Sequence, residues 1–127
     1  MGIVFRPLVC CIANSMRANN LCDVEEDVRM QRYTLPYHLG ATRSLLLFKL
    51  LYAAAFLFVA TGIALRLTPI VTLAIFLVIP LVVKNIRLFS QEQNKRTTFI
   101  TAIHNFFVII IPYMVCIWTG YLYRLFQ

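Results

Sequence analysis

Four of the five acidic residues in the chain lie within five positions of one another, and their spacing could hold a cation. They are Asp23, Glu25, Glu26 and Asp27. In a helix, Asp23 and Asp27 share a face, where two carboxylates repel each other unless a cation lies between them. Mg²⁺ prefers oxygen ligands and typically takes one or two protein carboxylates together with substrate phosphates. The cluster therefore indicates one part of a Mg²⁺ site.

Residues on either side of the acidic cluster fit a phosphate ligand. Asn19 and Asn20, one helical turn before the cluster, offer amide oxygens and N–H donors. Arg29 and Arg32 follow it, and a guanidinium group forms paired hydrogen bonds with phosphate oxygens. This combination is typical of a metal–diphosphate site. The plain alternative is an acidic surface segment in which Glu25 and Arg29 form a salt bridge across one helical turn.

The elements that carry this cluster have the composition of a membrane protein. Of the 127 residues, 61% are hydrophobic and 13% are charged, whereas a soluble domain is about half apolar and a quarter charged. A hydrocarbon core about 30 Å thick needs about 20 apolar helical residues. Three segments meet or approach that length: 44–65, 67–83 and 99–123. We expect an all-α, polytopic transmembrane bundle of about four helices.

The segment before the cluster, 1–21, is apolar at first and becomes polar toward its end. It lacks the order of a cleaved signal peptide, in which a basic start is followed by an apolar run and small residues. We predict a membrane helix whose last turns face a polar cavity. The expected organisation is this helix over 1–21, the acidic motif in a loop over 22–43, and the three apolar helices.

Local signals predict where the apolar helices begin. Thr68 before Pro69 is typical of an N-cap followed by proline at the first helical position, so the first two apolar spans should form a tight hairpin. Thr97 or Thr98 could cap the third span in the same way.

The distribution of positive charge predicts how the chain crosses the bilayer. Nine of the 12 Lys and Arg residues flank the two loops on one side of this topology, and Arg6, Arg66 and Arg124 lie on the other. Positive loops remain inside, so both loops should be cytoplasmic in a multi-pass protein of the cell membrane. The net charge of +7 does not indicate a nucleic-acid partner, because the positive residues form no basic stripe. The four cysteines lack zinc-ligand spacing and are expected to be reduced packing residues.

Polar side chains inside the apolar spans should face the interior of the bundle. We expect His104 and Asn105 to form interior hydrogen bonds, with direct substrate contact as the alternative. Lys49, near the start of its span, should extend toward the interface. His38 is interpreted as an exposed loop residue.

Taken together, the residues around the acidic cluster resemble the second aspartate-rich motif of the UbiA superfamily of intramembrane prenyltransferases. The pattern N-N-x-x-D-x-x-x-D begins at Asn19, and the basic residue Arg32, the pair Thr34-Leu35 and the pair Leu39-Gly40 follow in order. The branch that it resembles most is 1,4-dihydroxy-2-naphthoate polyprenyltransferase of menaquinone biosynthesis. The three apolar spans also match the last three helices of that family in order and in loop placement.

The resemblance implies a transferase built as a nine-helix bundle, of which this chain is the C-terminal part. In the family, two facing aspartate-rich motifs hold Mg²⁺ against a polyprenyl diphosphate, and an aromatic acceptor takes the prenyl group. The naphthoate acceptor loses its carboxylate as carbon dioxide. Carried over to this sequence, Asp23 and Asp27 would be the catalytic, metal-binding carboxylates. Asn19, Asn20 and Arg32 would bind substrate.

The sequence departs from the family pattern because the other aspartate-rich motif, of the type N-D-x-x-D-x-x-x-D, is absent from it. We therefore expect this chain alone to be inactive. It could be a split gene product, whose partner chain carries about five further helices, a truncated or internally started reading frame, or a decayed gene. The alternative is a non-catalytic regulatory or assembly subunit, or a relic of the enzyme. A small efflux transporter would need a carboxylate within a span, and none of the three spans has one.

Overall fold

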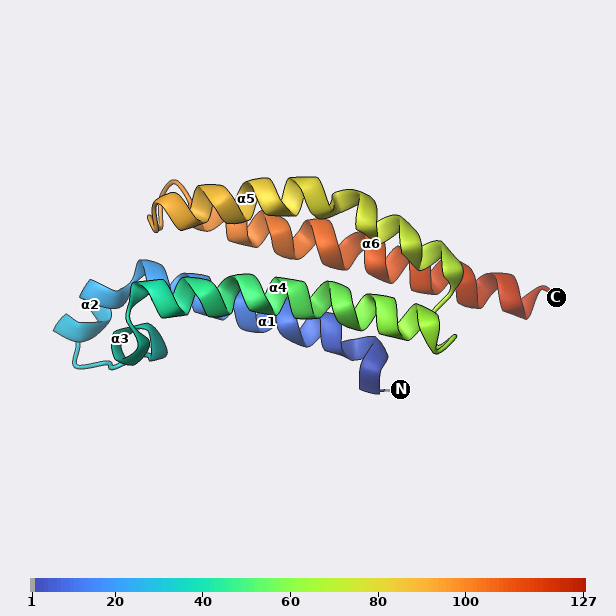
Figure 1. The fold of residues 1–127 in the computed structure, drawn as a ribbon, viewed down its shortest axis with the longest axis horizontal. Helices are drawn as coiled ribbons and strands as arrows, with labels where there is room; N and C mark the ends of the chain where they lie inside the picture. Colours follow the sequence, from blue (N-terminus) through green and yellow to red (C-terminus); the bar gives the residue numbers. More distant parts are fainter. Residues whose placement is uncertain (1) are drawn as a thin grey trace.

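Long helical rods run side by side in alternating directions (Figure 1). The computed structural model describes residues 2–127, and within that range it contains helices and no strand. The rods are α1 (Gly2–Cys22), α4 (Ala41–Ala64), the continuous pair η1 (Ile70–Val78) and α5 (Ile79–Gln91), and α6 (Phe99–Leu125). Two short helices, α2 (Val24–Arg29) and α3 (Leu35–Leu39), join α1 to α4. The predicted all-α bundle with about four long helices is confirmed.

Three of the rods are long and apolar enough to cross a membrane: Ala41–Ala64, Ile70–Gln91 and Phe99–Leu125. Large apolar side chains cover their outer faces, and Leu77 is 83% exposed. A soluble protein rarely shows so much contiguous apolar surface, whereas lipid covers it in a membrane. The chain is therefore a membrane protein by the length and composition of its helices. α1 forms the predicted helix from Gly2 onward, and Met1 lies outside the described residues. The crossing of the bilayer by α1 stays a prediction.

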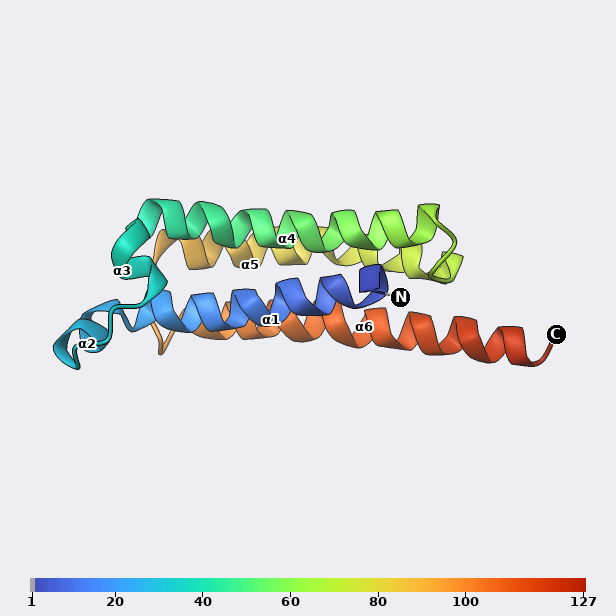
Figure 2. The ribbon, with the colours of Figure 1, turned by 90° about the horizontal axis from the view of Figure 1, so that it is seen from below.

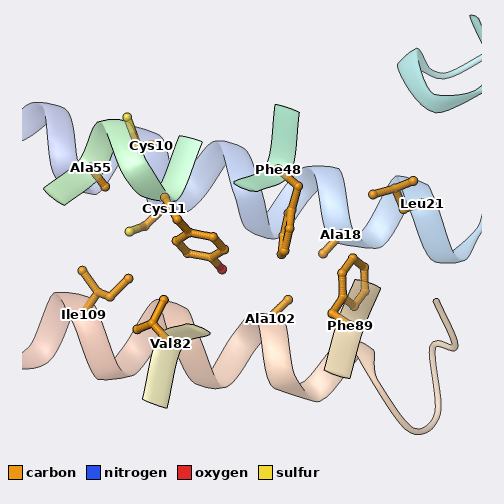
Figure 3. Packing of buried hydrophobic residues seen from close by; sticks show 11 residues of the cluster. Cys10, Cys11, Ala18, Leu21, Phe48, Ala55, Val82, Phe89, Ala102 and Ile109 are labelled. Carbon is orange, nitrogen blue, oxygen red and sulfur yellow. The ribbon is translucent and has the colours of Figure 1, made fainter. Parts of the chain in front are cut away.

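The four rods form a closed ring around a small core. α1 packs against α4 and α6, α6 packs against both η1 and α5, and α4 packs against η1 (Figure 2). Small side chains such as Ala18, Ala55 and Ala102 are buried, which lets helix backbones approach closely. Between them, the rings of Phe48 and Phe89 have centroids 4.9 Å apart, so that α4 and α5 meet across the centre (Figure 3).

The predicted cap of the second apolar span is wrong by one residue. Pro69 occupies the N-cap position of η1, and the buried hydroxyl of Thr68 has no hydrogen-bond partner. Thr68 instead closes the end of the preceding helix, because its backbone N–H donates to the Gly62 carbonyl at 3.3 Å. The turn between Ala64 and Ile70 is short, so the predicted tight hairpin is confirmed.

The second span also ends later than predicted, at Gln91 rather than at position 83. Lys84 and Arg87 lower the hydropathy there, but a buried stripe continues through Val82, Asn85 and Phe89. This stripe faces the bundle and keeps the helix packed after its average composition has become polar.

The first half of that span is a 3₁₀-helix of nine residues. Its interior residues Thr72 and Ile75 are three positions apart, as the three-residue turn of a 3₁₀-helix requires. The α-helical geometry of α5 begins at Ile79, and Pro80 lies in its first turn. The N–H groups of a first turn have no intrahelical partner, so proline, which lacks an N–H, is tolerated there.

The interior hydrogen bonds predicted for Asn105 are formed and join α5 to α6, whereas His104 is exposed and its predicted interior position is wrong. Asn105 is 0% exposed; its Oδ1 accepts from Asn85 Nδ2 at 2.8 Å, and its Nδ2 donates to the Val82 carbonyl at 3.3 Å. Asn85 Nδ2 also lies 3.0 Å from Nδ1 of His104, whose side chain is otherwise exposed. A second buried amide, Asn14, donates to the Phe48 carbonyl at 3.0 Å and joins α1 to α4.

Replacing Asn105 with Leu should destabilise the bundle, because Asn85 and the Val82 carbonyl would lose a partner in an apolar interior. Interhelical hydrogen bonds in membranes contribute about 0.6–1.7 kcal/mol each, so we expect a loss of about 1–2 kcal/mol. Unfolding of the chain in mixed micelles with increasing SDS measures it. His104→Leu is the control, since it leaves the Asn85–Asn105 bond in place, and equal losses in both variants would contradict the assigned network.

The remaining sequence predictions concern single residues. All four cysteines are free; Cys10, Cys11 and Cys116 are buried and Cys22 is half-buried, so the expected packing role is confirmed. Lys49 is exposed on α4, about two turns after the helix begins at Ala41, and His38 is exposed on α3.

Candidate functional site

The five predicted site residues lie at one end of the bundle. α1 ends at Cys22, Asp23 precedes α2, and the loop between α5 and α6 returns to the same end (Figure 1). The prediction that both polar loops lie on one side is therefore confirmed for their arrangement in the bundle.

A single cleft of about 560 Å³ brings these residues together. The side chains that line it are those of Asn19, Asn20, Asp23, Glu26, Asp27, Met30, Arg32, Thr34 and Lys95. All five residues identified from the motif are among them. Glu26 and Lys95 are additional charged members that were not assigned to the site from the sequence.

Backbone hydrogen bonds explain why these spaced residues share one cleft. The Asp23 N–H donates to the Asn19 carbonyl at 3.1 Å, and the Asp27 N–H donates to the Asp23 carbonyl at 2.8 Å. The Arg32 N–H then donates to the Asp27 carbonyl at 2.7 Å. Successive turns thus place the amide, the two carboxylates and the guanidinium along one side of the chain. Gln31, at φ 58°, makes the left-handed turn that brings Arg32 back after α2.

An ion pair between Lys95 and Asp23 joins the two loops across the cleft. The side chain of Asp23 is 13% exposed and that of Lys95 is 51% exposed. The Asp23 carboxylate accepts a hydrogen bond from the ammonium and raises the pKa of Lys95. It is the only salt bridge within residues 2–127, so the alternative pair between Glu25 and Arg29 is not formed.

The loop that carries Lys95 is held by its own hydrogen bonds. The Asn94 N–H donates to Thr98 Oγ1 at 2.8 Å, and the Arg96 N–H donates to Asn94 Oδ1 at 2.8 Å. Thr98 occupies the predicted N-cap position of α6, but its hydroxyl bonds to Asn94 and makes no capping bond to the helix. Lys95 is consequently fixed at the tip of a tight turn that faces the acidic cluster.

Sequence reasoning missed Lys95 because it lies 72 positions from its partner. The single signal that pointed to it was topological, since its loop was predicted on the same side as the acidic cluster.

A second hollow of about 860 Å³ adjoins the first. Asp23, Glu26 and Lys95 line both hollows. The ion pair therefore lies at the boundary between the two hollows.

The donor types in the cleft are those that Mg²⁺ takes together with an anionic ligand. Among the described residues, no three His, Cys, Asp or Glu side chains lie close enough to hold a metal ion by themselves. Asp27 has no ion-pair partner in that part of the chain, and Asp23 shares the cleft with it. Two carboxylates suffice for Mg²⁺ when phosphate oxygens and water complete its shell.

No protein-family model matches the sequence, and the searches of curated proteins and of solved structures found no match for it. The fold and the site define the chain as a helical membrane protein with an acidic cleft at one end of its bundle.

Proposed function

We propose that this chain is the C-terminal portion of a Mg²⁺-dependent membrane prenyltransferase and supplies one half of its diphosphate site. The enzyme would transfer a polyprenyl group from its diphosphate to an aromatic acceptor, and the motif favours 1,4-dihydroxy-2-naphthoate in menaquinone biosynthesis. The observation that carries the proposal is that Asn19, Asn20, Asp23, Asp27 and Arg32 all line one cleft. The positive-inside distribution of Lys and Arg favours a cytoplasmic position for this cleft, at the face of the cell membrane.

Loss of diphosphate from the prenyl substrate requires positive charge around the departing phosphate oxygens. Mg²⁺ held by Asp23 and Asp27 would neutralise charge on the departing phosphate oxygens. Arg32 adds a guanidinium suited to paired phosphate contacts, and the two asparagines can orient the ligand through their amide N–H groups. The apolar helices beneath the cleft give the polyprenyl tail a path away from water, which protects a reactive allylic centre.

Lys95 has two successive partners in this proposal. It neutralises Asp23 while the cleft holds no diphosphate, and its ammonium passes to the phosphate oxygens when Asp23 binds the metal. The two hollows that Asp23 and Lys95 both line would then become one site.

Replacing Lys95 with Gln should therefore change two affinities in opposite directions. Binding of Mg²⁺ alone should become tighter, because Asp23 loses its competing cation, and binding of the prenyl diphosphate with Mg²⁺ should become weaker. Titration calorimetry of the two ligands measures both changes. Lys84→Gln, the same change at an exposed position of α5 outside both hollows, is the matched control and should alter neither affinity.

The proposal is tested most directly by ligand uptake. The full chain in detergent micelles is titrated with farnesyl thiodiphosphate, which resists loss of its diphosphate, in Mg²⁺ or in EDTA. Because the chain supplies one half of the site, we expect weak but saturable binding in Mg²⁺ and none in EDTA. Equal binding under both conditions, or no binding at millimolar ligand, would refute the proposal.

A non-catalytic regulatory or assembly subunit is the second candidate, and one observation favours it. Asp23 is already neutralised by Lys95, so the ion pair could serve only to fasten the two loops together. In that case Lys95→Gln and Asp23→Asn should lower stability equally, and Mg²⁺ should change nothing. Thermal unfolding with and without Mg²⁺ and the thiodiphosphate separates the two candidates.

A further inference from the structure

A third cleft, of about 920 Å³, lies at the end of the bundle opposite the acidic cluster. Its lining residues belong to the turn between α4 and η1, with the helix ends on either side of it, and to the last turns of α6. Figure 1 shows these segments at the end of the bundle opposite α2. Arg66 and Arg124 line it together with the apolar side chains of Ile63, Ile70 and Val71. An apolar wall thus adjoins two guanidinium groups.

Neither guanidinium group of this cleft forms an ion pair within the described residues. Four of the five acidic residues lie around α2, and the fifth, Glu92, follows α5 at that same far end. The only ion pair within the described residues is between Lys95 and Asp23, so neither Arg66 nor Arg124 takes part in one. Two uncompensated guanidinium groups complement an anion, and the arginine fork suits phosphate oxygens in particular.

The position of the cleft at the ends of two apolar helices favours a lipid as its ligand. Arg66 follows the last turn of α4, and Arg124 lies in the last turn of α6, where both rods reach their ends. Exposed Tyr123 lines the cleft beside them. Aromatic and basic residues at the end of an apolar span are typical of the interface at which lipid phosphates lie. Acyl chains would continue along the apolar wall toward the hydrocarbon.

We propose that this cleft binds one anionic phospholipid, with its phosphate held by Arg66 and Arg124. The proposal is independent of the prenyltransferase assignment, because it shares no residue with the acidic cleft.

Arg66 allows a variant that removes the charge without disturbing the turn. Its φ of 55° lies in the left-handed region, which glycine adopts at no steric cost. Arg66→Gly therefore deletes the guanidinium and leaves a residue suited to the backbone. Arg124→Gln is the second variant, at an exposed helical position. Arg6→Gln is the matched control, since Arg6 has a different partner: its guanidinium lies 5.2 Å from the ring centroid of Phe58 and outside the cleft.

Native mass spectrometry of the full chain, released from micelles that contain phosphatidylglycerol or phosphatidylcholine, tests the proposal. We expect one phosphatidylglycerol retained in preference to phosphatidylcholine, at least a fivefold lower retention in Arg66→Gly and in Arg124→Gln, and unchanged retention in Arg6→Gln. Circular dichroism checks that each variant is folded.

Three results would overturn the proposal. Equal retention of the two lipids would remove the selectivity for an anion. An equal decrease in Arg6→Gln would show that only the overall charge matters. Displacement of the lipid by equimolar glycerol phosphate would identify a site for a small free anion instead.

Discussion

Asp27→Asn should abolish the Mg²⁺-dependent binding of a prenyl diphosphate and leave the fold intact. Asp27 lines the acidic cleft and has no ion-pair partner among the described residues, so the substitution removes a charge without breaking a contact between loops. Loss of a residue that merely supports a metal ligand typically weakens affinity by about 10–100-fold, and loss of a ligand itself should reach at least about 100-fold. Calorimetry with farnesyl thiodiphosphate and Mg²⁺ measures the effect.

Glu92→Gln is the control for that experiment, because it makes the same change of charge outside the cleft. Wild-type affinity in Asp27→Asn, or an equal loss in Glu92→Gln, would show that the carboxylates do not hold the metal. Asp23→Asn should also prevent binding, and in addition it should loosen the contact with Lys95. A structural subunit would show the reverse pattern, in which Asp23→Asn lowers stability and Asp27→Asn has no effect.

Gly120→Ala should destabilise the bundle, although alanine is the better helix former. A Cβ atom built on Gly120 would overlap the Cβ and Cγ atoms of Pro69, so the start of η1 would have to move away from α6. Forcing extra atoms into a packed contact typically costs about 1–3 kcal/mol, which offsets the helix-propensity gain of about 1 kcal/mol. We expect a net loss of about 1 kcal/mol in SDS unfolding.

The same substitution at a position without neighbours provides the control. Gly2 has open space where a Cβ would lie, so Gly2→Ala should leave stability unchanged or slightly higher. Retention of phosphatidylglycerol should also fall in Gly120→Ala, because Gly120 and Pro69 both line the lipid cleft. A gain of stability in Gly120→Ala would contradict the close packing of Pro69 on α6.

Patterns within one segment predicted the architecture and most of the acidic cleft. Long apolar runs need helices that satisfy their own backbone, so hydropathy identified the membrane helices. The four-residue spacing from Asn19 to Asp23 to Asp27 predicted a shared side of the chain, because local hydrogen bonds bridge that spacing. The function assigned from this motif stays a prediction.

Features that depend on distant partners were not predictable in this way. The contact of Lys95 with Asp23 requires the return of a loop after two further helices. The end of α5 at Gln91 depends on burial against α6 rather than on average composition. Thr68 resembled a cap in sequence, but the close approach of Gly62 made it the end of the preceding turn.

The 3₁₀ geometry of η1 sets how far its arm of the hairpin reaches. A 3₁₀-helix rises about 2.0 Å per residue and an α-helix about 1.5 Å, so η1 and α5 together extend roughly 37 Å, close to the roughly 36 Å of α4. The 22 residues of η1 and α5 therefore span about the same length as the 24 residues of α4. Wound as a regular α-helix it would stop about 4–5 Å short, and the ammonium of Lys95 would be drawn back from the carboxylate of Asp23.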